Sequence, residues 1–132
     1  MMACKTAEQV ITFADIKRYN RILQGEIWLA DLGERNGNIQ SGKRPVIVLQ
    51  NDIGNKYSPT TIVVPLTSQI KNLLPVHCDV RIECGLKKTS TSLMEQITTI
   101  NQSQLIRKIG MLDEEGHKAI KRAIIASFEG IL

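Results

Sequence analysis

The residues of this sequence best suited to chemistry are polar side chains at the ends of predicted strands. Arg44 follows a glycine-rich stretch, and Thr67 ends an apolar run and is followed by Ser68 and Gln69. An arginine side chain offers a fixed charge and a forked set of donors that suits a phosphate group. If a sheet brings Arg44 and Thr67 together, the pair would suit a phosphodiester. Nothing in the sequence alone shows that they meet, and polar residues commonly terminate strands.

Other kinds of catalytic site find little support in the sequence. His77 and His117 are the only histidines, and nothing brings the predicted strand of the first near the predicted final helix of the second. The sequence lacks the serine-hydrolase, metalloprotease, Walker and dinucleotide-binding motifs. Cys4, Cys78 and Cys84 show no CxxC spacing, so we expect reduced thiols that fill space. We therefore expect neither a metal site nor a cofactor.

Composition and charge restrict the class of protein to which this chain can belong. The chain has 132 residues, of which 42% are hydrophobic, and this fits one globular domain. A formal net charge of +4 and a pI near 9.1 are compatible with a polyanionic ligand or an acidic protein partner. The longest apolar stretches, such as 62–66, are too short to span a bilayer. The first residues also lack the apolar core of a secretion signal. We expect a cytoplasmic protein without a membrane association.

Short strands must position Arg44 and Thr67. Alternating or continuous apolar residues predict the strands, and polar stretches with glycine predict the turns between them. Pro45 is tolerable only near the start of its strand or on an edge, and Pro65 argues for an edge or a bulge. Residues 33–43 form a long loop, and long loops in compact domains are often functional. The strands are expected over 24–32, 44–50, 61–67, 76–83, 92–100 and 108–112.

Helices are expected at both ends of the chain and at one place within it. A capping box at residues 6–9 begins a helix from about Ala7 to Tyr19, in an N-terminal extension of residues 1–22. Asn51 begins a short helical turn, and Asp113 caps a final helix whose apolar residues recur at helical spacing. Short β segments with a closing helix predict a mainly β (α+β) domain over residues 23–132, built as a small barrel or curled sheet.

Six segments of the chain resemble the MazF/PemK family of toxin endoribonucleases, in the same order and at similar spacing. The resemblance covers roughly residues 24–128, and the block from the Arg-Pro pair to the Ser-Pro-Thr triplet is highly specific. It implies an SH3-like β barrel with peripheral helices and leaves the helix before Gln24 outside, as an extension. The segments are 24–28 (QGEIW), 44–52 (RPVIVLQND), 54–60 (GNKYSPT), 66–69 (LTSQ), 74–77 (LPVH) and 95–97 (EQI).

The resemblance also implies an activity. Toxins of this family belong to type II toxin–antitoxin systems, work as homodimers and cut single-stranded mRNA at short motifs without a metal, which inhibits translation and growth. The family's catalytic arginine falls on Arg44, and its threonine before Ser-Gln falls on Thr67. The implied reaction is attack by the RNA 2′-hydroxyl on the adjacent phosphorus, leaving a 2′,3′-cyclic phosphate and a 5′-hydroxyl. Arg44 would stabilise the charged transition state and take part in proton transfer, and Thr67 would hold a phosphoryl oxygen.

RNA contacts and a protein partner follow from the same resemblance. The loop of residues 33–43 would close over the RNA or be displaced by a MazE-like antitoxin with an acidic, partly disordered segment. Ile39 and Thr98 depart from many relatives, so the cleavage motif is not implied. A CcdB-like gyrase poison of the same fold is the alternative, although such a poison needs no Arg44–Thr67 pair. The RNA-binding residues would be Gln40, Lys43, Gln50, Asn51, Ser68, Gln69, Gln96 and Thr98.

Overall fold

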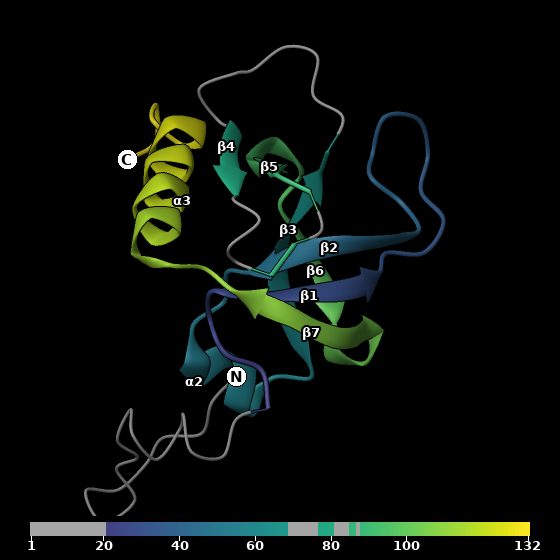
Figure 1. Cartoon of the computed structure of the whole chain (residues 1–132). Helices are drawn as coiled ribbons and strands as arrows, with labels where there is room; N and C mark the ends of the chain where they lie inside the picture. Colours follow the sequence, from purple (N-terminus) through teal and green to yellow (C-terminus); the bar gives the residue numbers. More distant parts are fainter. Residues whose placement is uncertain (1–20, 69–76, 81–84, 87) are drawn as a thin grey trace, which may run out of the picture.

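The computed structural model describes residues 21–68, 77–80, 85, 86 and 88–132, in which strands are followed by one long helix (Figure 1). A mainly β fold with a C-terminal helix is confirmed, whereas the predicted helix over 7–19 lies outside the described residues. The strands are β1 (Glu26–Asp31), β2 (Lys43–Val48), β3 (Thr60–Thr67), β4 (His77–Val80), β5 (Ser90–Leu93), β6 (Thr98–Asn101) and β7 (Leu105–Met111). The α-helices are α2 (Asp52–Tyr57) and α3 (Glu114–Ser127), and the 3-10 turns are η3 (Met94–Gln96) and η4 (Gln102–Gln104).

The described strands pair antiparallel in one curled sheet. Their order is β4-β5-β3-β2-β1-β7, and β6 also pairs with β3. The predicted position of Pro65 is an edge or a bulge, and β3 is not an edge strand, because it has partners on both sides. β3 pairs with β6 up to Val63 and with β5 from Leu66, so Pro65 lies between these two partners. A residue without an N–H group is tolerated there because that side of the strand has no registered partner at this point.

The single strand predicted over 92–100 is also wrong, because the 3-10 turn η3 divides it into β5 and β6. Val63 pairs with Thr98, three residues further along the chain than the β5 register would place its partner. The three residues of η3 take up this offset, and the first of them, Met94, is fully buried. Apolar periodicity does not distinguish one continuous strand from two short strands joined by a tight turn.

The core has two clusters, one on each face of the central strands. In β2, Ile47 belongs to the cluster that contains Ile120 of α3, whereas Val46 and Val48 belong to the opposite cluster together with Val63. Full burial of an aliphatic side chain of this size stabilises a fold by about 1.5–3 kcal/mol. Because both faces are covered, β2 has a continuous apolar run in place of the alternation typical of a half-exposed strand.

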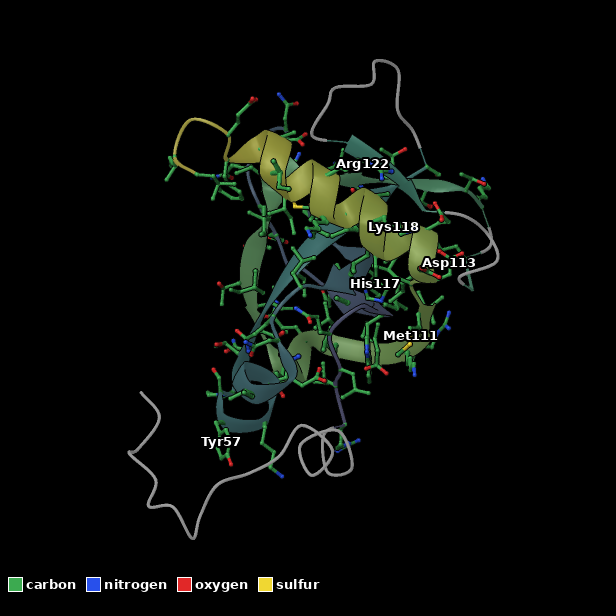
Figure 2. All side chains as sticks on the ribbon, turned by 90° about the vertical axis from the view of Figure 1, so that its left-hand side faces the viewer. Tyr57, Met111, Asp113, His117, Lys118 and Arg122 are labelled. Carbon is green, nitrogen blue, oxygen red and sulfur yellow. The ribbon has the colours of Figure 1, made fainter. Side chains whose placement is uncertain are left out.

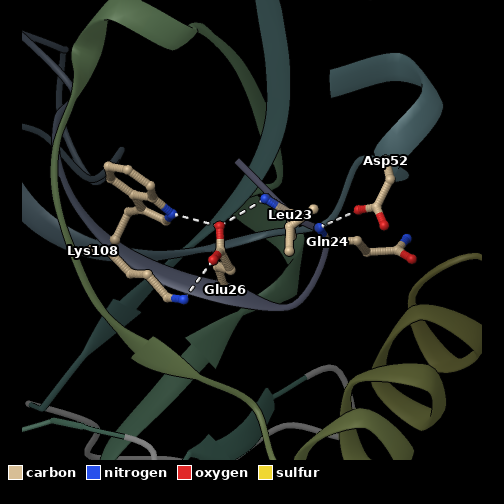
Figure 3. Close-up of polar contacts among 6 residues, drawn as sticks. Leu23, Gln24, Glu26, Asp52 and Lys108 are labelled. Atoms are coloured by element: carbon tan, nitrogen blue, oxygen red, sulfur yellow. Dashed lines mark hydrogen bonds and ion pairs between the residues drawn. The ribbon is translucent and has the colours of Figure 1, made fainter. Parts of the chain in front are cut away.

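Glu26, at the start of β1, is a carboxylate with only 3% of its surface exposed. Its Oε1 accepts hydrogen bonds from the Leu23 backbone N–H at 2.7 Å and from the Trp28 indole at 3.2 Å. Its Oε2 forms an ion pair with Lys108 Nζ of β7 at 2.7 Å (Figure 3). A buried carboxylate is costly unless it is paired and hydrogen-bonded. These three partners satisfy that requirement, and they tie the start of β1 to β7.

The helix α3 begins as predicted at the N-cap Asp113, whose side chain accepts a hydrogen bond from the Gly116 N–H at 2.8 Å. Glu114 and Glu115 follow in the first turn, where negative charge is favourable at the helix N-terminus. The helix contacts β4 and crosses one end of the molecule, whereas Tyr57 of α2 lies at the opposite end (Figure 2). The buried face of α3 thereby covers one of the two core clusters.

Gly25 joins the start of β1 to α3. Its φ is +87°, and a Cβ at this position would lie 2.7 Å from Cε1 of His117. Its carbonyl accepts a hydrogen bond from the Leu112 N–H at 2.9 Å, and its own N–H donates to the Val48 carbonyl at 2.8 Å. The position requires glycine both for its backbone conformation and for the close approach of the imidazole.

We expect Met94→Ala to lower the free energy of unfolding by about 2–5 kcal/mol, because truncation of a buried methionine leaves a cavity. Urea denaturation followed by circular dichroism measures this loss. Met111→Ala is the matched control, because Met111 is 42% exposed and exposed substitutions usually change stability by less than about 0.5 kcal/mol. Equal losses for the two variants would contradict the burial of η3 in the core.

Candidate functional site

A pocket of about 500 Å³ is lined by residues from β1, β2, β3, β5 and β7. It contains the two predicted catalytic residues, Arg44 and Thr67, and two of the predicted RNA-binding residues, Lys43 and Ser68. The structure thus brings together residues whose meeting the sequence alone could not show. The described lining residues are Leu29, Lys43, Arg44, Pro45, Leu66, Thr67, Ser68, Gly85, Leu86, Lys88, Ser90, Arg107 and Ile109.

The pairing of β2 with β3 determines where Arg44 and Thr67 lie. The two strands are antiparallel, and Val46 pairs with Pro65 nearest to the pocket. Continued by two residues along each strand, the same register places Arg44 opposite Thr67. Both side chains are half-buried, and Thr67 also pairs with Thr91 of β5. Arg44 pairs with Ala30 of β1 and Thr67 with Thr91 of β5, so each residue is held by a neighbouring strand, which is the kind of support that a precise site needs.

Four cations line this pocket, namely Lys43, Arg44, Lys88 and Arg107, and we call it the basic pocket. Its described lining includes no aspartate or glutamate. Within the described part of the chain, the ion pairs involve Lys108 and Lys118 and none of these four cations. Positive charge gathered in a concave site raises the local concentration of polyanions, so the described lining of the pocket suits a phosphate-rich ligand.

Lys88 and Arg107 are residues of this site that sequence reasoning missed. Arg107 reaches the pocket because β7 pairs with β1, with Arg107 opposite Leu29. Arg107 and Lys108 are the two polar side chains of residues 105–111, and nothing local distinguishes Arg107 from an ordinary exposed strand cation. The informative signal is the register between β1 and β7, which joins segments far apart in the chain and is not readable from either segment alone.

The β1–β2 loop, residues 32–42, contacts the basic pocket through Arg44. Arg44 Nε donates a hydrogen bond to the Ser41 carbonyl at 2.9 Å, the one polar contact of this side chain among the described residues. At the base of the loop, the Gly42 N–H donates to the Gly33 carbonyl at 2.9 Å. Its Nε is therefore anchored, whereas its two Nη groups have no hydrogen-bond partner among the described residues.

Three further predicted RNA-binding residues, Gln40, Gln96 and Thr98, contact this loop or belong to it. The Gln40 backbone N–H donates to Gln96 Oε1 at 2.7 Å, and Gln96 Nε2 donates to the Asn38 carbonyl at 3.1 Å. Thr98 Oγ1 accepts a hydrogen bond from Arg35 Nη1 at 3.4 Å. These polar groups hold the loop, and contact with RNA stays a prediction for all three residues.

Gln50 and Asn51 lie beyond the other end of β2 and are not among the residues that line the basic pocket. Gln50 Nε2 donates to Asn55 Oδ1 and to the Thr60 carbonyl, both at 3.1 Å. The Asn51 side chain accepts a hydrogen bond from the Gly54 N–H at 2.8 Å and caps α2. Gln50 thus holds α2 beside β3 and Asn51 caps the start of α2, and these contacts explain their polarity without RNA. Gln69 lies outside the described residues.

A second pocket, of about 440 Å³, lies between α3, β2 and the segment just before β1, and His117 is part of its lining. This histidine does not line the basic pocket, and the side chain of His77 lies outside the description. Among the described residues, no group of three or more His, Cys, Asp or Glu side chains is placed to hold a metal ion. No helix in the described ranges is long and apolar enough to cross a membrane.

Comparison of sequences relates the chain to a toxin family. The family model described as a PemK-like, MazF-like toxin of type II toxin–antitoxin system matches residues 23–128. Endoribonuclease EndoA of Bacillus subtilis is 42% identical over 105 residues, which cover 78% of this chain and 90% of that protein. Endoribonuclease MazF of Staphylococcus saprophyticus is 41% identical over 103 residues, with 76% and 86% covered.

Solved structures show the same architecture. Mycobacterium tuberculosis toxin MazF-mt6 matches with a TM-score of 0.68 and 25% identity, over 79% of this chain and 96% of that chain. An endoribonuclease in complex with its cognate antitoxin, from a mycobacterial species, matches with a TM-score of 0.70 and 20% identity, over 84% and 97%. At this identity the second likeness is one of fold. The predicted fold of the MazF/PemK type is confirmed.

We expect Gln50→Ala to lower the free energy of unfolding by about 1–2 kcal/mol, because it removes the hydrogen bonds to Asn55 and Thr60. Thermal denaturation measures the change, and Asn36→Ala in the exposed loop is the control for loss of an amide side chain. If Gln50→Ala kept wild-type stability but lost affinity for RNA, the structural role assigned to Gln50 would be wrong.

Proposed function

This chain belongs to the PemK-like, MazF-like toxin family of type II toxin–antitoxin systems, and we propose that it cuts single-stranded mRNA in the basic pocket. As a member of this family it is an endoribonuclease and the toxin of a toxin–antitoxin pair. The finer proposal concerns the substrate, the residues and the chemistry. One observation carries it: Arg44 and Thr67 share a pocket with three further cations and no described carboxylate.

The proposed reaction uses the RNA as its own nucleophile. The 2′-hydroxyl loses its proton and its oxygen bonds to the adjacent phosphorus, while the bond from phosphorus to the 5′ oxygen breaks. The 5′ oxygen takes up a proton, and the products carry a 2′,3′-cyclic phosphate and a 5′-hydroxyl. This chemistry needs neither a protein nucleophile nor a metal ion. It also restricts the substrate to RNA, because DNA lacks the 2′-hydroxyl.

Arg44 is proposed to stabilise the negative charge that develops on the phosphoryl oxygens. Guanidinium groups stay protonated in proteins, so the electrostatic role comes before any part in proton transfer. The bond from Arg44 Nε to the Ser41 carbonyl fixes the side chain and leaves its Nη donors for the phosphate. The Thr67 hydroxyl, across the pocket on β3, is proposed to hold another phosphoryl oxygen. Preorganised donors of this kind are usually the largest catalytic term.

The proposed partners follow from charge and family. The basic pocket suits an acidic, partly disordered segment of a MazE-like antitoxin, which would fold as it binds and cover the site. The homodimer, the cytoplasmic location and the block of translation belong to the same proposal.

We expect Arg44→Ala to slow cleavage of a long single-stranded RNA by about 100- to 1,000-fold, as for removal of one group that stabilises transition-state charge. Gel analysis of the RNA in EDTA measures the rate without a free metal ion. Arg122→Ala is the matched control, because Arg122 is an exposed arginine of α3 outside the basic pocket (Figure 2).

A DNA strand of the same sequence should stay intact beside the cleaved RNA. RNA of varied sequence that survives the wild-type protein would contradict the proposed nuclease and favour the CcdB-like gyrase poison. Cleavage by Arg44→Ala at the wild-type rate would refute the role assigned to Arg44.

Arg107→Gln should weaken binding of a 2′-O-methyl RNA, which cannot be cut, and should flatten the plot of log affinity against log salt. The slope should fall by about 0.7, the value for one phosphate contact to a single strand. Fluorescence anisotropy at several salt concentrations measures it, with Arg122→Gln as the control of equal charge change. An unchanged slope would remove Arg107 from the RNA path.

A further inference from the structure

Gln96, the last residue of η3, spans two backbone groups of the β1–β2 loop with one side chain. Its Oε1 accepts a hydrogen bond from the Gln40 N–H at 2.7 Å, and its Nε2 donates to the Asn38 carbonyl at 3.1 Å. Both polar ends of the amide are thus engaged, in the orientation that suits a carbonyl oxygen and an amino group. η3 itself is anchored in the core by Met94, which is fully buried.

The residue after Gln40 is Ser41, whose carbonyl accepts the hydrogen bond from Arg44 Nε at 2.9 Å. A short path therefore runs from the core through η3, Gln96 and the loop backbone to the guanidinium of Arg44. Each step of the path is a covalent bond or a hydrogen bond of 2.7–2.9 Å. This bond is the one polar contact of the Arg44 side chain among the described residues, so a shift of the loop backbone at Ser41 would move the guanidinium.

We infer that Gln96 is a positioning residue for Arg44, which it holds through the β1–β2 loop, and that its family-implied contact with RNA is not its main role. The inference rests on the proposed function, since it is the function that makes the placement of Arg44 matter. A base-reading role would require both amide groups of Gln96 to leave their partners on the loop. Positioning requires no rearrangement of the structure described.

The same loop has an opposing feature. The Gln40 side-chain oxygen is buried and has no hydrogen-bond partner among the described residues. An unsatisfied buried acceptor disfavours the observed position of the loop, whereas the two hydrogen bonds from Gln96 favour it. The two hydrogen bonds of Gln96 thus offset the cost of the buried Gln40 oxygen. Loss of the Gln96 amide should therefore release residues 38–41 from η3 without unfolding the sheet.

Gln96→Met tests the inference, because methionine has a similar length, no charge and no amide. We expect the Gln40 N–H and the Arg44 Nε–H to exchange with solvent about 10- to 100-fold faster by NMR, as for loss of two hydrogen bonds. The Gly42 N–H, which donates to the Gly33 carbonyl at the loop base, should keep its protection. In RNA cleavage, kcat should fall about tenfold or more, with a smaller change in KM, because transition-state charge is stabilised less well.

Gln104→Met is the matched control. Gln104 also bridges two backbone groups, with Oε1 accepting from the Asn101 N–H and Nε2 donating to the Asp31 carbonyl, both at 2.8 Å. It does not contact residues 38–41, so neither exchange rate nor kcat should change. Gln96→Glu keeps the acceptor for the Gln40 N–H and loses the donor to Asn38, so its Gln40 exchange should lie between wild type and Gln96→Met.

Two results would overturn the inference. One is wild-type exchange at both Gln40 and Arg44 in a folded Gln96→Met protein. The other is a change of preferred cleavage sites with kcat and exchange unaltered, which would restore base reading. Failure of the proposed function is a separate outcome: the wild-type protein would then leave RNA intact, while the exchange of Arg44 Nε–H would still report whether Gln96 positions it.

Discussion

The antiparallel register between β2 and β3 is the constraint on which the rest of this structure depends. Val46 opposite Pro65, Ile47 opposite Val64 and Val48 opposite Val63 place apolar side chains in both core clusters at once. A shift of one residue would move each side chain to the other face of the sheet. The same register brings Arg44 and Thr67 to one pocket. Core packing and site geometry are therefore two results of a single pairing.

Local sequence signals could predict most strands and helices of this fold, whereas the division of one strand and the full lining of the site depend on strand pairing. Strands with continuous apolar runs and the helix caps at Asn51 and Asp113 depend on neighbours a few residues away, and they follow from local chemistry. The division of 92–100 into two strands depends on β3 having different partners at its two ends. Arg107 lines the pocket because it pairs with Leu29, and neither strand's own sequence indicates this long-range pairing. The site was predictable only where the family motif carried it.

The segments that carry the family resemblance combine two kinds of residue. In segment 24–28, the buried Glu26 connects β1 to β7 through its ion pair with Lys108, and it does not line the basic pocket. In 44–52, Arg44 lines the pocket, whereas Gln50 holds α2 beside β3. A motif match of this kind therefore speaks for the fold and for the chemistry together. Only the structure separates the two, because burial and hydrogen-bond partners differ while residue types do not.

The contact of Gly25 with His117 has a consequence for how the protein is made. Gly25, just before β1, is synthesised early, yet it packs against Leu112 and against His117 of α3, which follow much later in the chain. A core that depends on contacts between distant segments forms late. On the ribosome, the core cluster that contains Ile47 therefore stays open until α3 has emerged, because Ile120 and Ala123 of α3 belong to it. A truncated chain that lacks α3 is left without one cover of its core.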